Sequence, residues 1–534
     1  MTIRTFRWPM LAAAAIVALG CDESVVPDIN APTLFPKDYT GLQSAFTGAA
    51  GSAVRADIVN YTLDLTSMAR DAAYFTASEP RFLTQLTGEQ PIANDAFGAT
   101  AWNGFFSTIK GIDTTQSVLT TLTNGQPLSR DTLAALWGQL ETLKALHYIY
   151  LADGRDTAGV PINAVGGATS AGTVAPILCL PSTWGEIVAI LDSAVDSLTV
   201  IPAGTTLISG LVPSGYELVS DNSTHWRDFT LALRAKAHIE YAYAIARGST
   251  GSNGTGAPSA SSPGLPDVNQ LDSAVADFDT LATHGLLYND GALNPLGTVG
   301  ADPGVYLQFS TASGDIQDGL ANDAPGYFVL LGAAAQIDTL HDQRFLAKFG
   351  RGTLPTTSYD GGGVPASALG SDWQYGAGTQ AATFGLSGVL PIVRNVQLHL
   401  LHAEALIGLG QYSQAITIIN DVRTAAGGLS AQAVAPDYID ARDFLLQELL
   451  VSLLSETGDH LIAIRNYGLT TELLTTWNNF GGDLHSAALP IPIAEASARN
   501  NNITPVCSTS GAAQAVRIAP HPSPRAAPVA RRIR

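Results

Sequence analysis

The stretch AEALIGLGQYSQA, residues 403–415, decides the fold. Small and apolar residues fill a helix that ends at Gly410, Tyr412 is placed to pack into the turn, and Ala415 allows the returning helix to approach closely. This is the pattern of a tetratricopeptide helix pair. Such a pair can bury one face only against neighbouring pairs, so several must stack to make a core. The stretch therefore predicts a mainly α-helical scaffold built from helix hairpins.

Other segments along the chain also carry apolar residues at helical spacing. Apolar residues in the segment 132–152 recur along one 3.6-residue stripe, and Ser182 supplies a capping hydroxyl for a helix that runs to about Leu198. Arg234 to Leu281 is a looser copy of the helix pair, with the flexible Gly/Ser stretch 248–266 inserted in its turn. We expect Trp102, Trp137 and Trp184 to lie in the core. The remaining predicted helices cover 38–68, 102–122, 226–247, 268–284, 392–409, 414–424 and 437–465.

The helical pattern is lost between about residues 285 and 391, in a stretch rich in Gly, Asp, Tyr and Trp. A disordered linker is poor in aromatic residues, so this stretch reads as an ordered, loop-rich insert. Long ordered loops on a helical scaffold are where binding sites usually lie.

The first twenty residues predict a signal peptide, with Arg4 and Arg7 before a short apolar run. That run ends VALGC at Cys21, which resembles a bacterial lipobox whose cysteine is acylated and becomes the new N-terminus. Two or more acyl chains would anchor the protein firmly. We expect residues 21–36 to form an extended tether, 37–510 the helical domain, and 511–534 a disordered, arginine-bearing tail.

The charge of the chain argues against one class of partner. The net charge of −19 becomes −21 once Arg4 and Arg7 are removed, and it argues against a nucleic-acid partner, because phosphate binding depends on clustered cations. The other two cysteines, Cys179 and Cys507, could form one disulfide or could each be a small buried apolar residue.

Motifs for catalysis, metal binding or cofactor binding are weak. On a helix, His399 and Glu404 diverge by about 140°, so His399, His402 and Glu404 do not converge on one metal ion. The glycine-rich segment 251–256 follows no strand, and no nucleophile elbow occurs. We expect no cofactor and no metal. A pair of carboxylates of the kind that glycosidases use stays open, because a separation of about 5–10 Å is invisible in sequence.

The C-terminal third resembles the SusD/RagB family of outer-membrane nutrient-binding lipoproteins. The family pattern is an arginine that opens a helix, Ala-Glu-Ala, Gly-x-Tyr, Asn-x-Val-Arg, a Glu-rich helix and a closing Pro-Ile-Pro. It matches Arg394, 403–405, 410–412, 420–423, 447–450, 456–460, Arg465 with Gly468, and 490–492 with Glu495 and Asn500. His460 and Ala463 stand where the family has arginine and aspartate, so we expect an ion pair of the family to be missing. Weaker matches at 102–113, 143–161 and 184–198 extend the resemblance over nearly the whole mature chain.

This resemblance implies a scaffold of four tetratricopeptide-like pairs with a loop-rich insert, and a lid role over a SusC-type TonB-dependent transporter. It implies a binding protein, not an enzyme, lipid-anchored at the outer membrane and facing the exterior, with an oligosaccharide as ligand. Three alternatives stay open: the same scaffold binding peptides or other organic nutrients, a surface glycoside hydrolase, and an assembly scaffold without a small ligand.

Five aromatic residues are candidate ligand contacts, because sugars need flat apolar faces beside polar groups. Tyr74 and Phe75 follow an early helix, on a loop where the family often places ligand contacts. Tyr306, Trp373 and Tyr375 lie in the insert. The alternative for each is that the ring packs its loop against the helices.

Overall fold

The computed structural model describes residues 55 to 507, except 56, 75–80, 87–91, 93–96, 98, 123–128, 163–174, 206, 208–215, 218–221, 249–256, 260, 296–301, 313–317, 319–326, 331–336, 352–372 and 471–487. All of the described residues belong to one compact unit. The predicted signal peptide, Cys21, the tether and the tail lie outside the described residues. Within the described part, no helix combines the length and the apolar character needed to cross a membrane.

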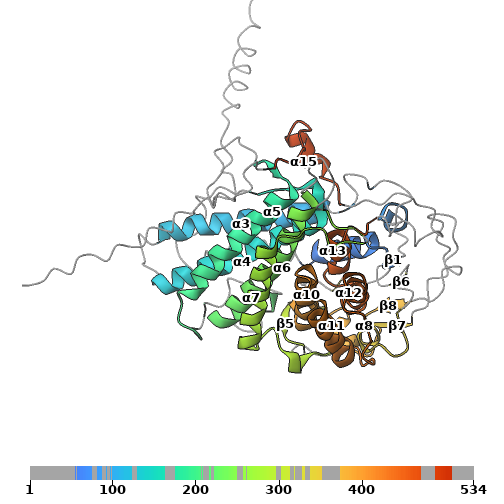
Figure 1. Cartoon of the computed structure of the whole chain (residues 1–534). Helices are drawn as coiled ribbons and strands as arrows, with labels where there is room; N and C mark the ends of the chain where they lie inside the picture. The colour runs from blue at the N-terminus through green and yellow to red at the C-terminus, as the bar shows by residue number, and fades with distance from the viewer. Residues whose placement is uncertain are drawn as a thin grey trace, which may run out of the picture. The chain divides into compact units, whose positions relative to one another are not determined.

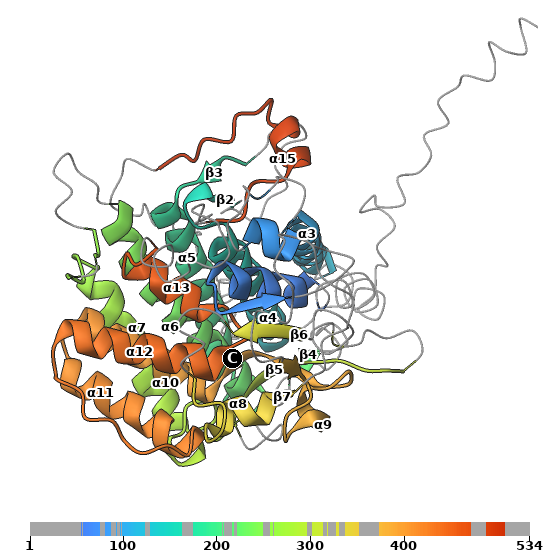
Figure 2. The same cartoon turned by 90° about the vertical axis from the view of Figure 1, so that its right-hand side faces the viewer.

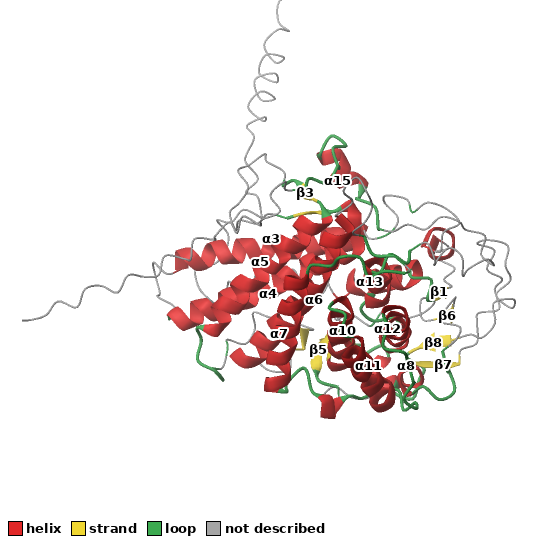
Figure 3. Ribbon diagram, viewed as in Figure 1, coloured by secondary structure: helices red, strands yellow, loops and turns green. Residues whose placement is uncertain are grey.

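Long helices that pack on their neighbours in chain order make up most of the described chain (Figures 1 and 3). Each helix from α3 to α7 packs on the next, α7 packs on α10, and α10 contacts both α11 and α12, of which α12 contacts α13. The predicted mainly α-helical scaffold of packed helix hairpins is therefore confirmed. The helices are α3 (Ala99–Leu122), α4 (Arg130–Arg155), α5 (Leu180–Thr199), α6 (Ser223–Gly248), α7 (Val268–His284), α10 (Asn395–Gly408), α11 (Tyr412–Asp421), α12 (Tyr438–Leu453), α13 (Asp459–Asn466) and α15 (Ile493–Ala498).

The helix pair predicted around residues 403–424 is present. Helix α10 ends before Gly410, whose φ of 74° lies in the left-handed region, and α11 begins two residues later at Tyr412. A π-helical turn, Val422–Ala426, continues α11. The looser copy is also a packed pair, because α6 lies along α7 and Arg234 of α6 contacts Asp277 of α7 at 2.6 Å.

Local signals predicted the bounds of α7 correctly and those of α5 less well. The Asp267 carboxylate accepts a hydrogen bond from the Gln270 backbone amide at the start of α7, and Gly285 ends that helix with a φ of 65°. Ser182 is not the cap of α5. That helix begins at Leu180, two residues earlier. Pro181 does not prevent this start, because the N–H that proline lacks would have no intrahelical acceptor in the first turn.

The single helix predicted over 437–465 is wrong. The chain leaves α12 after Leu453 and starts α13 at Asp459. Ser455 and Gly458 have φ values of 61° and 75°, which no helix accommodates. Gly458 is required there, because a Cβ would lie 2.4 Å from the Leu65 side chain.

Strands run through the region predicted as a loop-rich insert, so that description is incomplete. The larger sheet has the order β1-β6-β8-β7 and a three-stranded sheet has the order β4-β5-β9, all antiparallel. Two short helices, α8 (Gln343–Lys348) and α9 (Ala381–Phe384), lie between these strands in sequence. The strands are β1 (Ala72–Tyr74), β4 (Tyr216–Glu217), β5 (Gly304–Gln308), β6 (Tyr327–Leu330), β7 (Phe349–Arg351), β8 (Trp373–Tyr375) and β9 (Val389–Arg394).

The C-terminal segment returns to the first half of the chain and is fastened there. A hairpin of β2 (Val160–Pro161) and β3 (Ile177–Leu178) lies near α15 in Figure 2. Val506 pairs in parallel with Leu178, and Cys507 forms a disulfide with Cys179 across a Cα–Cα distance of 5.0 Å. The question that the sequence left open about these two cysteines is answered by this bond.

Large aromatic side chains fill the space between the helices. Trp184 and Trp226 are among the largest fully buried residues, and Trp102 is also buried. Trp137 is only half-buried, so its predicted place in the core is not fully met.

Candidate functional site

A row of aromatic and cationic positions crosses the four-stranded sheet from edge to edge. In the backbone register, Tyr74 of β1 pairs with Phe328 of β6, Phe328 with Trp373 of β8, and Trp373 with Arg351 of β7. Segments that are far apart in the sequence therefore meet at one line of positions, which we call the aromatic row. Two of the predicted ligand residues, Tyr74 and Trp373, lie in it. Arg351 and Phe328 were missed, because the pairing register of distant strands is invisible in a single sequence.

The side chain of Trp373 is held between two neighbours. It is only 5% exposed, and the Phe345 ring of α8 meets its ring edge to face at 4.7 Å between centroids. The exposed Arg351 places the central carbon of its guanidinium 4.2 Å from the centroid of the indole, a cation–π contact. Trp373 is thus a fixed platform whose cationic neighbour reaches solvent.

Tyr375, two residues further along β8, packs inward. It is 2% exposed and contacts the rings of Phe349 and Phe384 edge to face at 5.7 and 5.8 Å. Its environment favours the packing role that the sequence left as the alternative. A ligand role for this ring stays a prediction that only a binding measurement can decide.

The other predicted site residues do not join the aromatic row. Tyr306 lies on β5 in the separate three-stranded sheet, is 2% exposed, and donates its hydroxyl hydrogen to the Asp302 carbonyl oxygen at 2.6 Å. That buried bond also favours packing. Phe75 and the predicted lipidation residue Cys21 lie outside the described residues.

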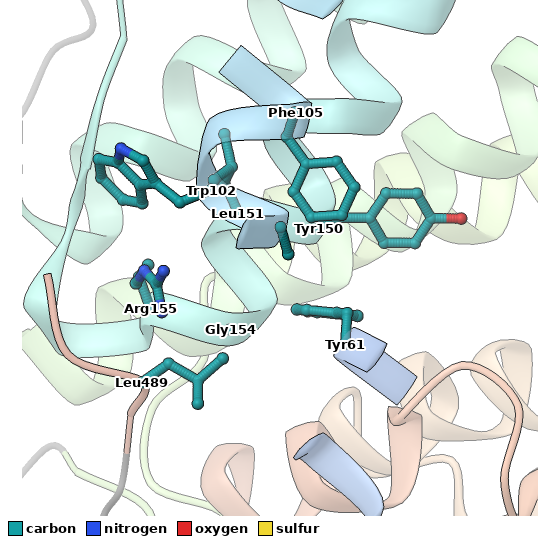
Figure 4. Close-up of a pocket in the computed structure, with 9 residues that line it drawn as sticks. Tyr61, Trp102, Phe105, Tyr150, Leu151, Gly154, Arg155 and Leu489 are labelled. Carbon is teal, nitrogen blue, oxygen red and sulfur yellow. The ribbon is translucent and has the colours of Figure 1, made fainter. Parts of the chain in front are cut away.

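A second aromatic cluster surrounds a small cavity between the 57–68 helix, α3, α4 and Leu489 (Figure 4). The Arg155 guanidinium lies over the Trp102 ring at 5.0 Å, and burial lowers the pKa of Arg155 to about 10. The cavity volume of about 10 Å³ suits roughly one water molecule, far less than a sugar ring. The cluster therefore acts as packing in this conformation. Its lining residues are Tyr61, Ala101, Trp102, Phe105, Tyr150, Leu151, Gly154, Arg155 and Leu489.

Two buried glutamates converge on one asparagine. Such a pair of carboxyls bears on the glycoside hydrolase alternative. The side-chain amide of Asn466 donates to Glu240 at 3.1 Å and to Glu404 at 3.2 Å. Burial raises the pKa of Glu404 to about 7, and burial with the neighbouring Glu404 charge holds the pKa of Glu240 well above its usual range. The two residues are 4% and 2% exposed. A general acid or base must come within hydrogen-bond reach of a substrate, whereas this pair faces Asn466 inside the helix stack.

A buried lysine ties several helices together nearby. Lys236 of α6 donates to Asp153 of α4 at 3.0 Å and to Asp459 of α13 at 2.7 Å, and Gln397 of α10 donates to Asp459 at 2.6 Å. Burial opposes the charge on Lys236, but the two carboxylates outweigh it and raise the lysine pKa. Removing one partner would leave an uncompensated buried charge, so this cluster fixes the helices relative to one another.

The residues that carry the family resemblance form a second buried hub. Arg394, which precedes α10, donates to Glu456 and to Asp302, each at 2.8 Å, and Lys348 donates to Glu456 at 2.7 Å. Burial alone would raise the pKa of Glu456, but Arg394 and Lys348 outweigh it and keep that pKa below its usual value. The motif therefore has a structural role, because it joins α10 to the break between α12 and α13.

The two histidines of α10 serve separate partners. The Nε2 atom of His399 lies 2.9 Å from a carboxylate oxygen of Asp290, and the Nδ1 atom of His402 lies 2.9 Å from the Tyr288 hydroxyl. Burial lowers the pKa of His402 to about 4. Glu404 points to Asn466 instead. Over the described ranges, no three His, Cys, Asp or Glu side chains lie together as metal ligands would.

His460, which stands where the family has arginine, has an acidic partner after all. Its Nδ1 atom lies 3.0 Å from both carboxylate oxygens of Asp71. Burial raises the pKa of Asp71, and His460 offsets part of that rise. The helix α13 therefore contacts an aspartate near the N-terminus of the described chain, which is a different contact from the family ion pair that the sequence predicts to be missing.

Comparison with known proteins identifies the fold. No family model and no curated protein matches the chain. Among solved structures, a SusD superfamily protein from Bacteroides vulgatus ATCC 8482 aligns with a TM-score of 0.59 at 12% identity, over 89% of this chain and 99% of that one. Another, from Bacteroides thetaiotaomicron VPI-5482, has a TM-score of 0.59 at 16% identity, over 86% and 97%.

Two further matches have names that mention glycans. The surface glycan-binding protein A from Bacteroides fluxus has a TM-score of 0.55 at 12% identity, over 87% of this chain and 97% of that one. A protein solved with a xylogluco-oligosaccharide has a TM-score of 0.55 at 16% identity, over 82% and 85%. The chain is thus a stacked helix-hairpin scaffold with a strand-bearing insert. More particularly, it has the fold of the SusD superfamily, as the sequence resemblance predicted.

Proposed function

We propose that this protein binds a glycan at the outer surface of a bacterium and passes it to a SusC-type TonB-dependent transporter. The observation that carries the proposal is the SusD-superfamily fold, shared over 82–89% of the chain with proteins of which one is a surface glycan-binding protein and another was solved with an oligosaccharide. The aromatic row adds a local reason, because the backbone register brings aromatic positions and the exposed Arg351 to one line of the sheet, and sugars bind where aromatic and polar groups lie together. Binding would be reversible capture without a cofactor.

Binding without catalysis is the favoured form of this function. The Glu240–Glu404 pair is a described arrangement of two neighbouring carboxyls, and it is buried against Asn466. The raised pKa values of the two glutamates are explained first by burial and, for Glu240, also by the neighbouring Glu404 charge. The pair therefore gives no support to hydrolysis.

The binding proposal is tested by calorimetry and by gel retardation with a panel of polysaccharides, oligosaccharides and peptides. We expect at least one glycan to bind and no reducing ends to be released from it. Release of reducing ends would support the hydrolase alternative. Binding of peptides but of no glycan would support the alternative in which the same scaffold binds peptides.

The anchor and the location rest on the lipobox at Cys21 and on the acidic residues Asp22 and Glu23 that follow it. We propose acylation of Cys21 and exposure of the body to the exterior. Fatty-acid labelling of the wild type and of Cys21→Ser tests the anchor, and protease digestion of intact cells tests exposure. Copurification with a large barrel protein is expected if the transporter partner is correct.

A further inference from the structure

Arg351 differs from several other guanidinium groups of the described chain in having no carboxylate beside it among the described residues. Arg234, Arg344, Arg394 and Arg423 each contact at least one acid within 3 Å. Arg351 has no such ion pair among the residues that the structure describes, although the sequence holds 46 acids and only 27 lysines and arginines. Among the described residues, Arg351 is therefore an exposed guanidinium without an acid partner, and a group of this kind can bind an anion.

The contact with Trp373 restricts the position of the Arg351 guanidinium and does not use its N–H hydrogen-bond donors. The central carbon of the guanidinium lies 4.2 Å from the centroid of the indole, and this cation–π contact uses none of its N–H groups as hydrogen-bond donors. Trp373 itself is fixed, because it is 5% exposed, meets Phe345, and pairs with Arg351 in the backbone register. A guanidinium that is already restricted in this way loses less conformational entropy when it binds a carboxylate through two parallel hydrogen bonds.

We propose that Arg351 recognises the carboxylate of an acidic sugar, so that the glycan bound at the aromatic row contains uronic acid residues. This inference rests on the proposed glycan-binding function and narrows its ligand class. Trp373 acts as a positioning residue that holds the guanidinium flat. Its predicted role as a direct ligand contact stays a prediction beside this one.

The charge of the whole protein works against a polyanion, so the attraction must be local. A net charge of −19 repels an acidic glycan at long range. At physiological ionic strength that repulsion is screened beyond about 8 Å, whereas a paired carboxylate at hydrogen-bond distance is screened much less. Affinity for the acidic ligand should therefore be retained at 0.15 M salt and should not improve as salt is lowered.

The test compares uronate oligomers with neutral sugars that differ only in the carboxylate. Calorimetry at about 0.15 M salt would use short oligomers of galacturonate, glucuronate and mannuronate, each with its carboxyl-reduced counterpart. We expect the wild type to bind at least one uronate oligomer more tightly than its reduced form. Arg351→Gln should weaken that binding about ten- to a hundredfold, the range for a hydrogen bond to a charged group, and should leave the neutral sugar unaffected. Arg351→Lys should recover only part of the loss.

A matched control is Arg130→Gln. Arg130 is exposed at the first residue of α4 and shows no ion pair within the described chain, so its loss removes the same charge away from the aromatic row. We expect no change in uronate affinity. For the positioning role, Trp373→Phe keeps a ring face and should keep the acid preference, whereas Trp373→Leu should lose the preference while neutral binding persists.

The outcomes separate this inference from the proposed function. Equal affinity for the acidic and reduced sugars, or full affinity in Arg351→Gln, would overturn the inference and leave glycan binding intact. Tighter binding of a sulfated oligosaccharide than of any uronate would overturn the carboxylate assignment. Absence of binding to every glycan, acidic or neutral, would overturn the proposed function itself.

Discussion

Replacing Glu404 by glutamine should make the protein more stable at pH 8 and leave its stability near pH 5 almost unchanged. In the fold, Glu404 shares the amide of Asn466 with Glu240 and is 2% exposed. Burial raises its pKa from 4.5 to about 7. A glutamine has the shape of the protonated acid and can still accept from Asn466, so the substitution imitates the neutral form at every pH.

The sign follows from the raised pKa. The protonated form of Glu404 stabilises the fold fully below pH 4.5, and that contribution is lost as the pH rises through about 7. Because each pKa unit corresponds to about 1.4 kcal/mol, the wild type should lose roughly 2–3 kcal/mol from this group between pH 5 and pH 8. Glu404→Gln should not lose it. Other buried acids with raised pKa values, such as Asp153 and Asp302, act equally in both proteins and cancel in the difference.

Urea unfolding followed by tryptophan fluorescence at pH 5, 7 and 8 measures the effect, with a double-mutant cycle that adds Glu240→Gln. Because the Glu404 charge raises the pKa of Glu240, the double variant should gain less at pH 8 than the two single gains together. A difference between Glu404→Gln and wild type that is the same at all three pH values would refute the reasoning. A variant that is less stable at pH 8 would do so more directly.

Three further substitutions probe other parts of the fold, each measured by urea unfolding at pH 7. Cys179→Ser with Cys507→Ser opens a loop closed across 328 residues and should cost about 3–5 kcal/mol, and a reductant should reproduce the loss in the wild type but not in the variant. Lys236→Met leaves two buried aspartates without their cation and should cost about 3–5 kcal/mol; a neutral result would show that water reaches them. Gly468→Ala should cost about 1–3 kcal/mol, because Gly468 has a φ of 68° and a Cβ would lie 2.3 Å from a backbone oxygen, whereas no loss would indicate that the neighbouring loop yields.

Elements with local signals could be predicted from the sequence. Helix α7 has an aspartate cap at one end and a left-handed glycine at the other, so its bounds were predicted as observed. The break after Leu453 could not be predicted, because Ser455 adopts a positive φ that the residue type does not announce. Its cause is tertiary: the buried hub around Glu456 holds that segment against Arg394 and Lys348.

In the candidate site, too, the sequence indicated residue types, whereas only the fold shows which of them lie together. The sequence indicated Tyr74 and Trp373 as aromatic residues in the right regions, but not that the register sets them in one row. Arg351 belongs to no motif and is the last residue of the short strand β7, so the sequence did not indicate it before the fold placed it over Trp373. Likewise, the burial of Tyr306 and Tyr375 depends on partners that are contributed by other elements.

The bond between Cys179 and Cys507 also orders events in time. A chain made from its N-terminus presents Cys179 long before Cys507 follows, so the thiol must wait through 328 residues for its partner. The sequence contains only one other cysteine, Cys21, and the proposed acylation would take that sulfur out of thiol exchange. Cys179 then has no other free thiol than Cys507 to pair with among these 534 residues, and the bond can form only after residue 507 has been added.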